Sequence, residues 1–141
     1  MPAIRIGEAT FEMGDEGRGD AVLLLHGFPT TRLLWRGVAP ALAAAGWRVL
    51  TPDLLGYGKS VAPPDARPDM ATQAAYLLRL LDALEVAKAV VIAHDVGSAA
   101  AQIMVATARD QAGSPHRCRP PRNEPARAMP TIGLQCRDAP H

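Results

Sequence analysis

The stretch that most constrains the fold of this 141-residue chain spans residues 90–102 and reads VVIAHDVGSAAAQ. It opens with three β-branched apolar residues, which predict a short buried strand. From Ser98 onward the residues are small and helix-forming, so a helix is expected to follow. This change places Asp95 at the tip of a tight strand-to-helix turn. Ala93 and Gly97, two residues before and two after it, are small enough for the two backbones to approach closely.

This turn gives Asp95 two candidate roles. At a helix N-terminus, unpaired N–H groups and the helix dipole stabilise a negative charge, so the carboxylate is available as a nucleophile. Attack on a carbonyl would give only a labile anhydride, whereas attack on an epoxide or carbon–halogen carbon gives an ester. The alternative is a simple helix cap, because aspartate is among the commonest N-cap residues. The stretch alone leaves both roles open.

The composition restricts the class of protein. The formal net charge of +1 predicts no binding to nucleic acid or to an anionic membrane. No apolar run approaches the roughly 20 residues of a membrane-spanning helix, and residues 1–13 carry charges where a signal peptide would be apolar. The two cysteines, Cys118 and Cys136, support no metal site. We therefore expect a cytoplasmic protein of about one domain that uses neither a cofactor nor a metal.

The first strands are predicted from short apolar runs. Residues 3–6 and 9–13 favour an antiparallel hairpin at a sheet edge, and the charged, glycine-rich residues 14–20 favour a loop. Residues 21–25 are all apolar, as in a central strand covered on both faces. The HGFP sequence that follows, residues 26–29, predicts a rigid loop at the carboxyl end of that strand. Ligands bind at this edge in open α/β sheets.

The next segments repeat a strand-and-helix alternation. Residues 33–45 predict a helix that either is kinked at Pro40 or begins late, with Pro40 in its first turn. Residues 47–51 predict a strand, and residues 70–84 give the clearest amphipathic helix pattern in the chain, with Asp69 as its N-cap. Together with the strand and helix around the tight turn, this order predicts an α/β fold with a parallel, doubly covered sheet.

The GKS triplet at residues 58–60 resembles part of a phosphate-binding loop. That motif requires a glycine five positions before the first residue of the triplet, where Asp53 stands. A helix should follow the motif, but Pro63 and Pro64 come instead. We therefore interpret residues 53–60 as a glycine-shaped turn.

The composition changes at about residue 107. Residues 107–141 contain six of the thirteen prolines and six of the fifteen Lys and Arg, all six being Arg, and no periodic apolar pattern was recognised in them. We expect two parts, a folded core over residues 1–106 and an irregular tail over 107–141 that is disordered or translated out of frame. A basic interaction tail and a proline-rich ligand are the alternatives.

Residues 1–106 resemble the N-terminal half of the α/β-hydrolase fold, a three-layer αβα architecture with a mostly parallel sheet. Four blocks carry the resemblance in the family order: HGFP at 26–29, residues 35–60, the helix at 70–84, and AHDVG at 93–97. The last block is similar to the branch with an aspartate nucleophile, which holds epoxide hydrolases, haloalkane dehalogenases and haloacetate dehalogenases. The resemblance implies a small, apolar, electrophilic substrate.

The resemblance also implies a role for each residue in two of the blocks. Asp95 would be the nucleophile, and the backbone N–H groups of Phe28 and Val96 would form an oxyanion hole. The remaining residues would shape the loop and the turn: His26, Gly27, Pro29, Ala93, His94 and Gly97. Haloalkane dehalogenases usually have halide-binding donors at the positions of Phe28 and Val96. Neither side chain can donate a hydrogen bond, which favours epoxide chemistry.

Other parts of the family mechanism have no counterpart in the sequence. The family uses a later acid and a histidine, beyond a helical lid, to activate the water that cleaves the ester. Only His116 and His141 follow Asp95, and both lie in the tail. We expect a fragment that turns over no substrate and whose strand before Asp95 is an unprotected edge. The alternative function is a non-catalytic partner-binding or regulatory module that uses this edge, including for self-association.

Overall fold

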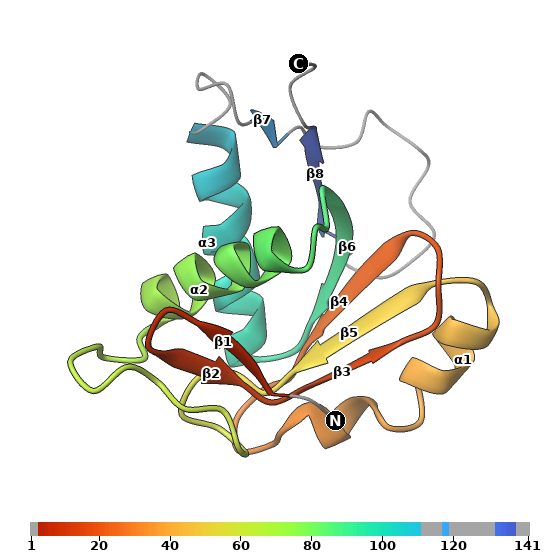
Figure 1. Ribbon diagram of the computed structural model, residues 1–141. Helices are drawn as coiled ribbons and strands as arrows, with labels where there is room; N and C mark the ends of the chain where they lie inside the picture. The colour runs from red at the N-terminus through yellow and green to blue at the C-terminus, as the bar shows by residue number, and fades with distance from the viewer. Residues whose placement is uncertain (1–2, 111–116, 119–131, 138–141) are drawn as a thin grey trace.

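The computed structural model describes residues 3–110, 117–118 and 132–137 (Figure 1). Its strands are β1 (Ile4–Ile6), β2 (Ala9–Phe11), β3 (Met13–Glu16), β4 (Ala21–Leu25), β5 (Arg48–Pro52), β6 (Lys88–Ala93), β7 (Arg117–Cys118) and β8 (Ile132–Arg137). Its helices are the short 3₁₀ helix η1 (Arg32–Trp35), α1 (Ala39–Ala44), α2 (Met70–Ala83) and α3 (Val96–Asp110). The predicted alternation of strands and helices is confirmed.

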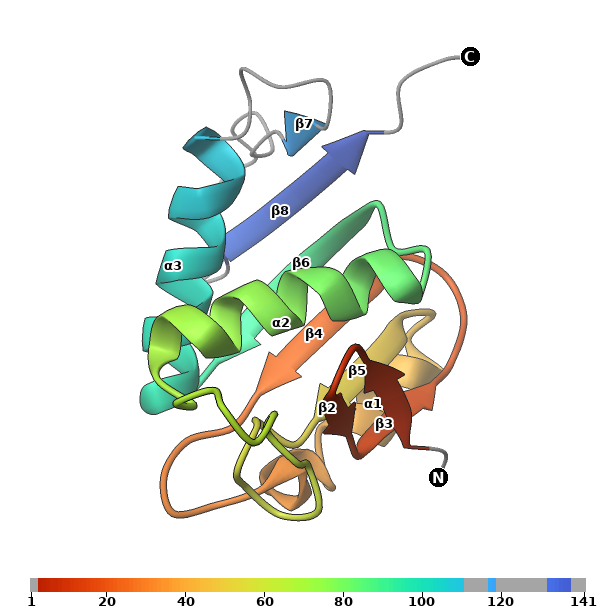
Figure 2. The same ribbon diagram turned by 60° about the vertical axis from the view of Figure 1, so that its left-hand side comes forward.

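A six-stranded sheet in the order β3-β5-β4-β6-β8-β7 forms the centre of the fold. β4 is parallel to both of its neighbours, β5 and β6, and all five of its residues are buried. Leu23 and Leu25 belong to the core that contains α2 and α3, whereas Val22 and Leu24 pack with α1 on the other face. Figure 2 shows α2 crossing one face of the sheet with α1 behind it. The predicted three layers are therefore present.

The N-terminal hairpin differs from the prediction in its position. β1 and β2 pair antiparallel, as expected, but they form a separate two-stranded sheet. The edge of the main sheet is β3, which includes residues 14–16 of the predicted loop and pairs antiparallel with β5. Gly14 lies opposite Thr51, and a Cβ at Gly14 would meet the hydroxyl of Thr51. Glycine is thus accommodated in this strand because it makes room for the partner side chain.

The helix starts follow the expected capping residues, with one shift. α1 has Pro40 in its first turn, which confirms the late start. α2 begins after Asp69, whose Oδ1 accepts a hydrogen bond of 2.8 Å from the N–H of Thr72. α3 begins at Val96, two residues earlier than expected, because only His94 and Asp95 separate it from β6.

The cap of α2 gives a pH-dependent prediction. The backbone N–H of Thr72 lowers the pKa of Asp69 below its ordinary value of 3.8. The stabilisation is therefore present above pH 3.8 and is lost as the pH falls through the lower folded-state pKa. We expect Asp69→Ala to lower the melting temperature at neutral pH and to have less effect in acid. Asp69→Asn caps without titrating in this range, so its melting temperature should lack this pH-dependent component. Thermal unfolding by circular dichroism across pH 2–7 measures both.

The tail contains a strand that was not predicted. β8 pairs antiparallel with β6, with Lys88–Val91 opposite Ile132–Gln135, so the expectation of an unprotected edge before Asp95 is wrong. Residues 132–137 read IGLQCR, an alternation of apolar and other residues that is typical of a strand. Because β6 is paired with β4 on one side and with β8 on the other, it has no free edge for the self-association that we predicted. The expected irregularity of residues 111–116, 119–131 and 138–141 lies outside the described residues.

The helices in the described part of the chain include no candidate for a membrane span. None of the helices there is long and apolar enough to cross a bilayer.

Candidate active site

Asp95 lies in a two-residue turn at the carboxyl edge of the sheet. β6 ends at Ala93 and α3 begins at Val96. Asp95 has a φ of 52°, in the left-handed region that aspartate tolerates better than most residues. The amide of Gly97 donates to the carbonyl of His94, and this bond of 3.0 Å closes the turn. The structure thus has the strand, tight turn and helix that the sequence predicted, with the exposed Asp95 side chain at the tip.

Two glycines allow the HGFP loop and the turn to touch. A Cβ on Gly27 would lie 2.6 Å from the Cβ of Asp95 and 2.7 Å from the Nδ1 atom of His94. A Cβ on Gly97 would lie 2.5 Å from the carbonyl oxygen of His26 and 2.8 Å from that of Leu25. Both contacts are far shorter than van der Waals distances, so these positions require glycine. The loop and the turn are held together by backbone contacts.

Gly97→Ala is expected to destabilise the fold. The added methyl group would meet backbone carbonyls, which cannot rotate away, and overpacking of this kind costs about 1–3 kcal/mol. Gly37→Ala is the matched control, because no atom lies within 4 Å of the added methyl group. Urea unfolding should show a lower midpoint for Gly97→Ala alone. Equal midpoints for the two variants would contradict the close approach of β4 and α3.

The backbone N–H of Phe28 points at the carboxylate of Asp95. Its nitrogen lies 3.2 Å from Oδ2, although the two residues are 67 positions apart in the sequence. Pro29 follows Phe28 through a cis peptide bond. Val96 is the first residue of α3, and N–H groups in the first turn have no helical acceptor. The structure thus brings Phe28 to Asp95, and the oxyanion-hole role of Phe28 and Val96 remains a prediction.

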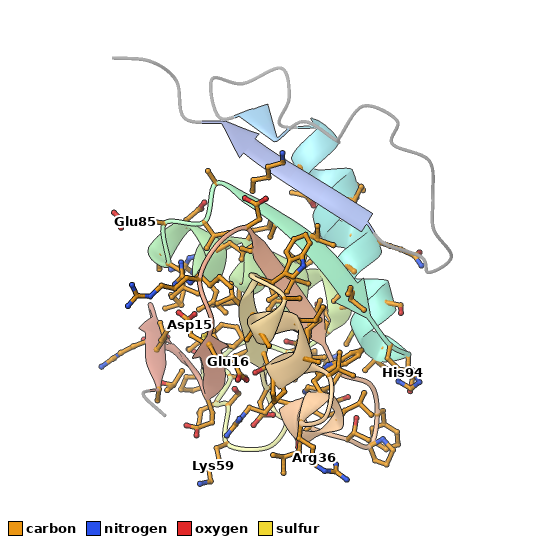
Figure 3. All side chains as sticks on the ribbon, turned by 90° about the vertical axis from the view of Figure 1, so that its right-hand side faces the viewer. Asp15, Glu16, Arg36, Lys59, Glu85 and His94 are labelled. Atoms are coloured by element: carbon orange, nitrogen blue, oxygen red, sulfur yellow. The ribbon has the colours of Figure 1, made fainter. Side chains whose placement is uncertain are left out.

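The two histidines near Asp95 differ in their environments. His26 is fully buried, and its Nε2 accepts a hydrogen bond of 2.9 Å from the N–H of Leu54. Its Nδ1 lies 3.0 Å from the carbonyl oxygen of Gly27, so the proton is assigned to Nδ1 from this geometry. His94 is exposed at the turn, in the lower part of the view in Figure 3. His26 therefore has both ring nitrogens occupied, and its structural role remains a prediction.

Asp53, which the sequence predicted only as part of a turn, accepts hydrogen bonds from two separate segments. Its side chain is buried, and Oδ1 accepts from the N–H of Arg32 at 2.7 Å. Its Oδ2 accepts from the N–H of Lys59 at 3.3 Å, and its backbone carbonyl accepts from the hydroxyl of Ser60 at 2.7 Å. An aspartate at a strand end before a glycine-rich turn was the available signal, since its carboxylate commonly accepts from nearby backbone N–H groups.

Apolar side chains are exposed on the segment that follows β4. Phe28 is 64% exposed, and its ring meets the edge of Tyr57 with centroids 6.5 Å apart. Leu33 and Leu34 on η1 are also exposed. Because Phe28 adjoins Asp95, the nucleophile candidate lies beside apolar surface. Within the described residues, no three His, Cys, Asp or Glu side chains are grouped as metal ligands.

Comparisons with known proteins agree with the fold. A family model described as the alpha/beta hydrolase fold matches residues 20–119. An epoxide hydrolase of Caballeronia sordidicola is 46% identical over 87 residues, which are 60% of this chain and 26% of the relative. A haloalkane dehalogenase of Mesorhizobium japonicum is 41% identical over 83 residues, 59% of this chain and 26% of the relative. The crystal structure of an epoxide hydrolase from Vigna radiata superposes with a TM-score of 0.71 at 28% identity, covering 77% of this chain and 36% of that one. The chain thus spans about a quarter of the length of these two curated relatives.

Proposed function

Because this chain belongs to the α/β-hydrolase fold family, we propose that it carries the nucleophile of an epoxide hydrolase-like site, with Asp95 as the attacking group. The observation that supports this most directly is the hydrogen bond from the N–H of Phe28 to Oδ2 of Asp95. It orients the carboxylate through one oxygen, which leaves Oδ1 for the attack. A simple helix cap would not account for a donor from a loop 67 residues away.

The proposed first step is the opening of an epoxide by Asp95. A lone pair of Oδ1 forms a bond to one ring carbon, and the bond from that carbon to the ring oxygen breaks. The electron pair goes to the ring oxygen, which takes up a proton from solvent and becomes a hydroxyl. The product is a hydroxyalkyl ester on Asp95. The exposed ring of Phe28 offers apolar contact to the substituent of the epoxide.

The proposed second step is hydrolysis of this ester by water. Negative charge develops on the ester carbonyl oxygen, where the N–H groups of Phe28 and Val96 would stabilise it. A general base must remove a proton from the attacking water. His26 is not available for this because Leu54 and Gly27 occupy its ring nitrogens. A complete hydrolytic cycle is proposed only for a protein in which another group supplies this base.

A second candidate is carbon–halogen cleavage by the same carboxylate. The identity to a haloalkane dehalogenase favours it, since the first step would again give an ester, with halide as the leaving group. The side chains of Phe28 and Val96 provide no donor for the departing halide. We therefore rank epoxides above haloalkanes.

Peptide mapping after covalent labelling tests both candidates. The purified chain is incubated with styrene oxide or with a bromoalkane of similar size, digested, and analysed by mass spectrometry. We expect the peptide with Asp95 to gain the full mass of the epoxide. Faster labelling by the bromoalkane would reverse the ranking. Labelling spread evenly over exposed carboxylates would refute Asp95 as a nucleophile.

A further inference from the structure

The loop that carries Phe28 is anchored at each end by one of two consecutive residues, Leu54 and Asp53. At its start, His26 accepts a hydrogen bond of 2.9 Å from the N–H of Leu54. At its end, the N–H of Arg32 donates to Oδ1 of Asp53 at 2.7 Å. Asp53 and Leu54 directly follow β5, and the loop begins directly after β4, which pairs with β5 in the sheet. The end of β5 therefore holds the loop that leaves β4.

These anchors matter because the side chain of Phe28 is too exposed to fix the loop by itself. Phe28 is 64% exposed and lies between the two anchored residues. Its N–H must nevertheless stay within hydrogen-bond distance of Asp95, where it is now at 3.2 Å. A backbone N–H cannot be directed by its own side chain. Its direction is set by the residues that hold the chain on either side.

Asp53 is suited to this task by its burial and its charge. Its side chain is 3% exposed, and a buried carboxylate requires donors. The bond from the N–H of Arg32, at 2.7 Å, is shorter than the bond of 3.3 Å from the N–H of Lys59, so Arg32 is held more closely by this carboxylate. The carboxylate is itself held by the N–H of Lys59 in the turn after it.

We propose that Asp53, acting through the backbone N–H of Arg32, is a positioning residue that holds the N–H of Phe28 against the carboxylate of Asp95. Asp53 does not touch the substrate. Its consequence for catalysis rests on the proposed function, because only a nucleophilic Asp95 needs an oriented carboxylate. The positioning itself is measurable without any chemistry.

One pair of variants isolates the anchoring bond. Arg32→Pro removes the N–H that donates to Asp53, and proline suits this site because Arg32 is the first residue of η1 and follows the extended Thr31. Arg32→Ala removes the same side chain, with its 4.0 Å contact to Glu12, but keeps the N–H. The two variants therefore differ chiefly in the bond under test.

The readout is the amide resonance of Phe28 in proton–nitrogen correlation spectra of the full chain. Each protein is measured with Asp95 and with Asp95→Ala, and the difference reports the contact between Phe28 and the carboxylate. We expect this difference to be unchanged in Arg32→Ala and at least roughly twofold smaller in Arg32→Pro, since the bond that directs the loop is lost. An equal difference in both variants, in folded protein, would overturn the proposal.

A second pair covers the outcome in which Arg32→Pro does not fold. Asp53→Leu replaces both acceptor oxygens by methyl groups with the same branching at Cγ, whereas Asp53→Asn keeps one oxygen for the N–H of Arg32. The Phe28 response should persist in Asp53→Asn and fall in Asp53→Leu, and equal responses would again overturn the proposal. Labelling by styrene oxide is recorded separately. An intact Phe28 response without labelling would refute the proposed function and leave the positioning in place.

Discussion

Replacement of Asp95 by asparagine is expected to reduce covalent labelling by an epoxide by roughly 10³-fold or more, the scale lost when a catalytic nucleophile is removed. The amide is isosteric with the carboxylate, so the turn should keep its shape. It lacks the negative charge, and its neutral amide oxygen is a much weaker nucleophile than a carboxylate oxygen. The rate of adduct formation, followed by intact-protein mass spectrometry, measures the effect.

The control for this prediction is Asp82→Asn, which changes an exposed carboxylate on α2. Its labelling should equal that of the unchanged chain. A similar loss in both variants would mean that the epoxide reacts with surface carboxylates without selection. Retained labelling in Asp95→Asn would exclude Asp95 as the nucleophile, while the fold assignment would stand.

Asp95 and its turn could be predicted because their signal is local. The change from β-branched residues to small helix formers occurs within residues 90–102 and needs no knowledge of distant parts of the chain. The helix starts could be predicted for the same reason, since Asp69 lies next to the helix that it caps and Pro40 lies in the first turn of its helix. Local chemistry also placed β4 at the centre of the sheet, because five consecutive apolar residues suit only a strand covered on both faces.

Local patterns could not predict the interactions that arrange the site, because these join distant residues; only the family resemblance brought Phe28 and Asp95 together. The N–H of Leu54 meets His26 across 28 positions, and Phe28 meets Asp95 across 67. Each residue alone has an ordinary explanation, so Asp53 was interpreted as part of a turn and its bond to Arg32 was not anticipated. The pairing of β8 with β6 is a similar case, because which edge a strand joins is decided by the whole sheet.

The ester formed on Asp95 is expected to persist in this 141-residue chain, which would give at most one event per molecule. A positioned general base contributes a factor of about 10² to 10⁴ to such a step. The buried His26 cannot act as this base, because Leu54 and Gly27 occupy both of its ring nitrogens. His116 and His141, the two histidines that follow Asp95 in the sequence, lie outside the described residues.

Labelling in water enriched with oxygen-18 measures this persistence. Hydrolysis of the ester through attack on its carbonyl would place the heavy oxygen in the carboxylate of Asp95. Turnover would therefore increase the mass of the peptide that contains Asp95. We expect the adduct mass to remain stable after excess epoxide is removed, and the peptide with Asp95 to gain no heavy oxygen. Hydroxylamine should release the adduct, which controls for the ester linkage. Several diols per protein, together with heavy oxygen in Asp95, would show that the chain supplies its own base, and the search for that base would then turn to His94, His116 and His141.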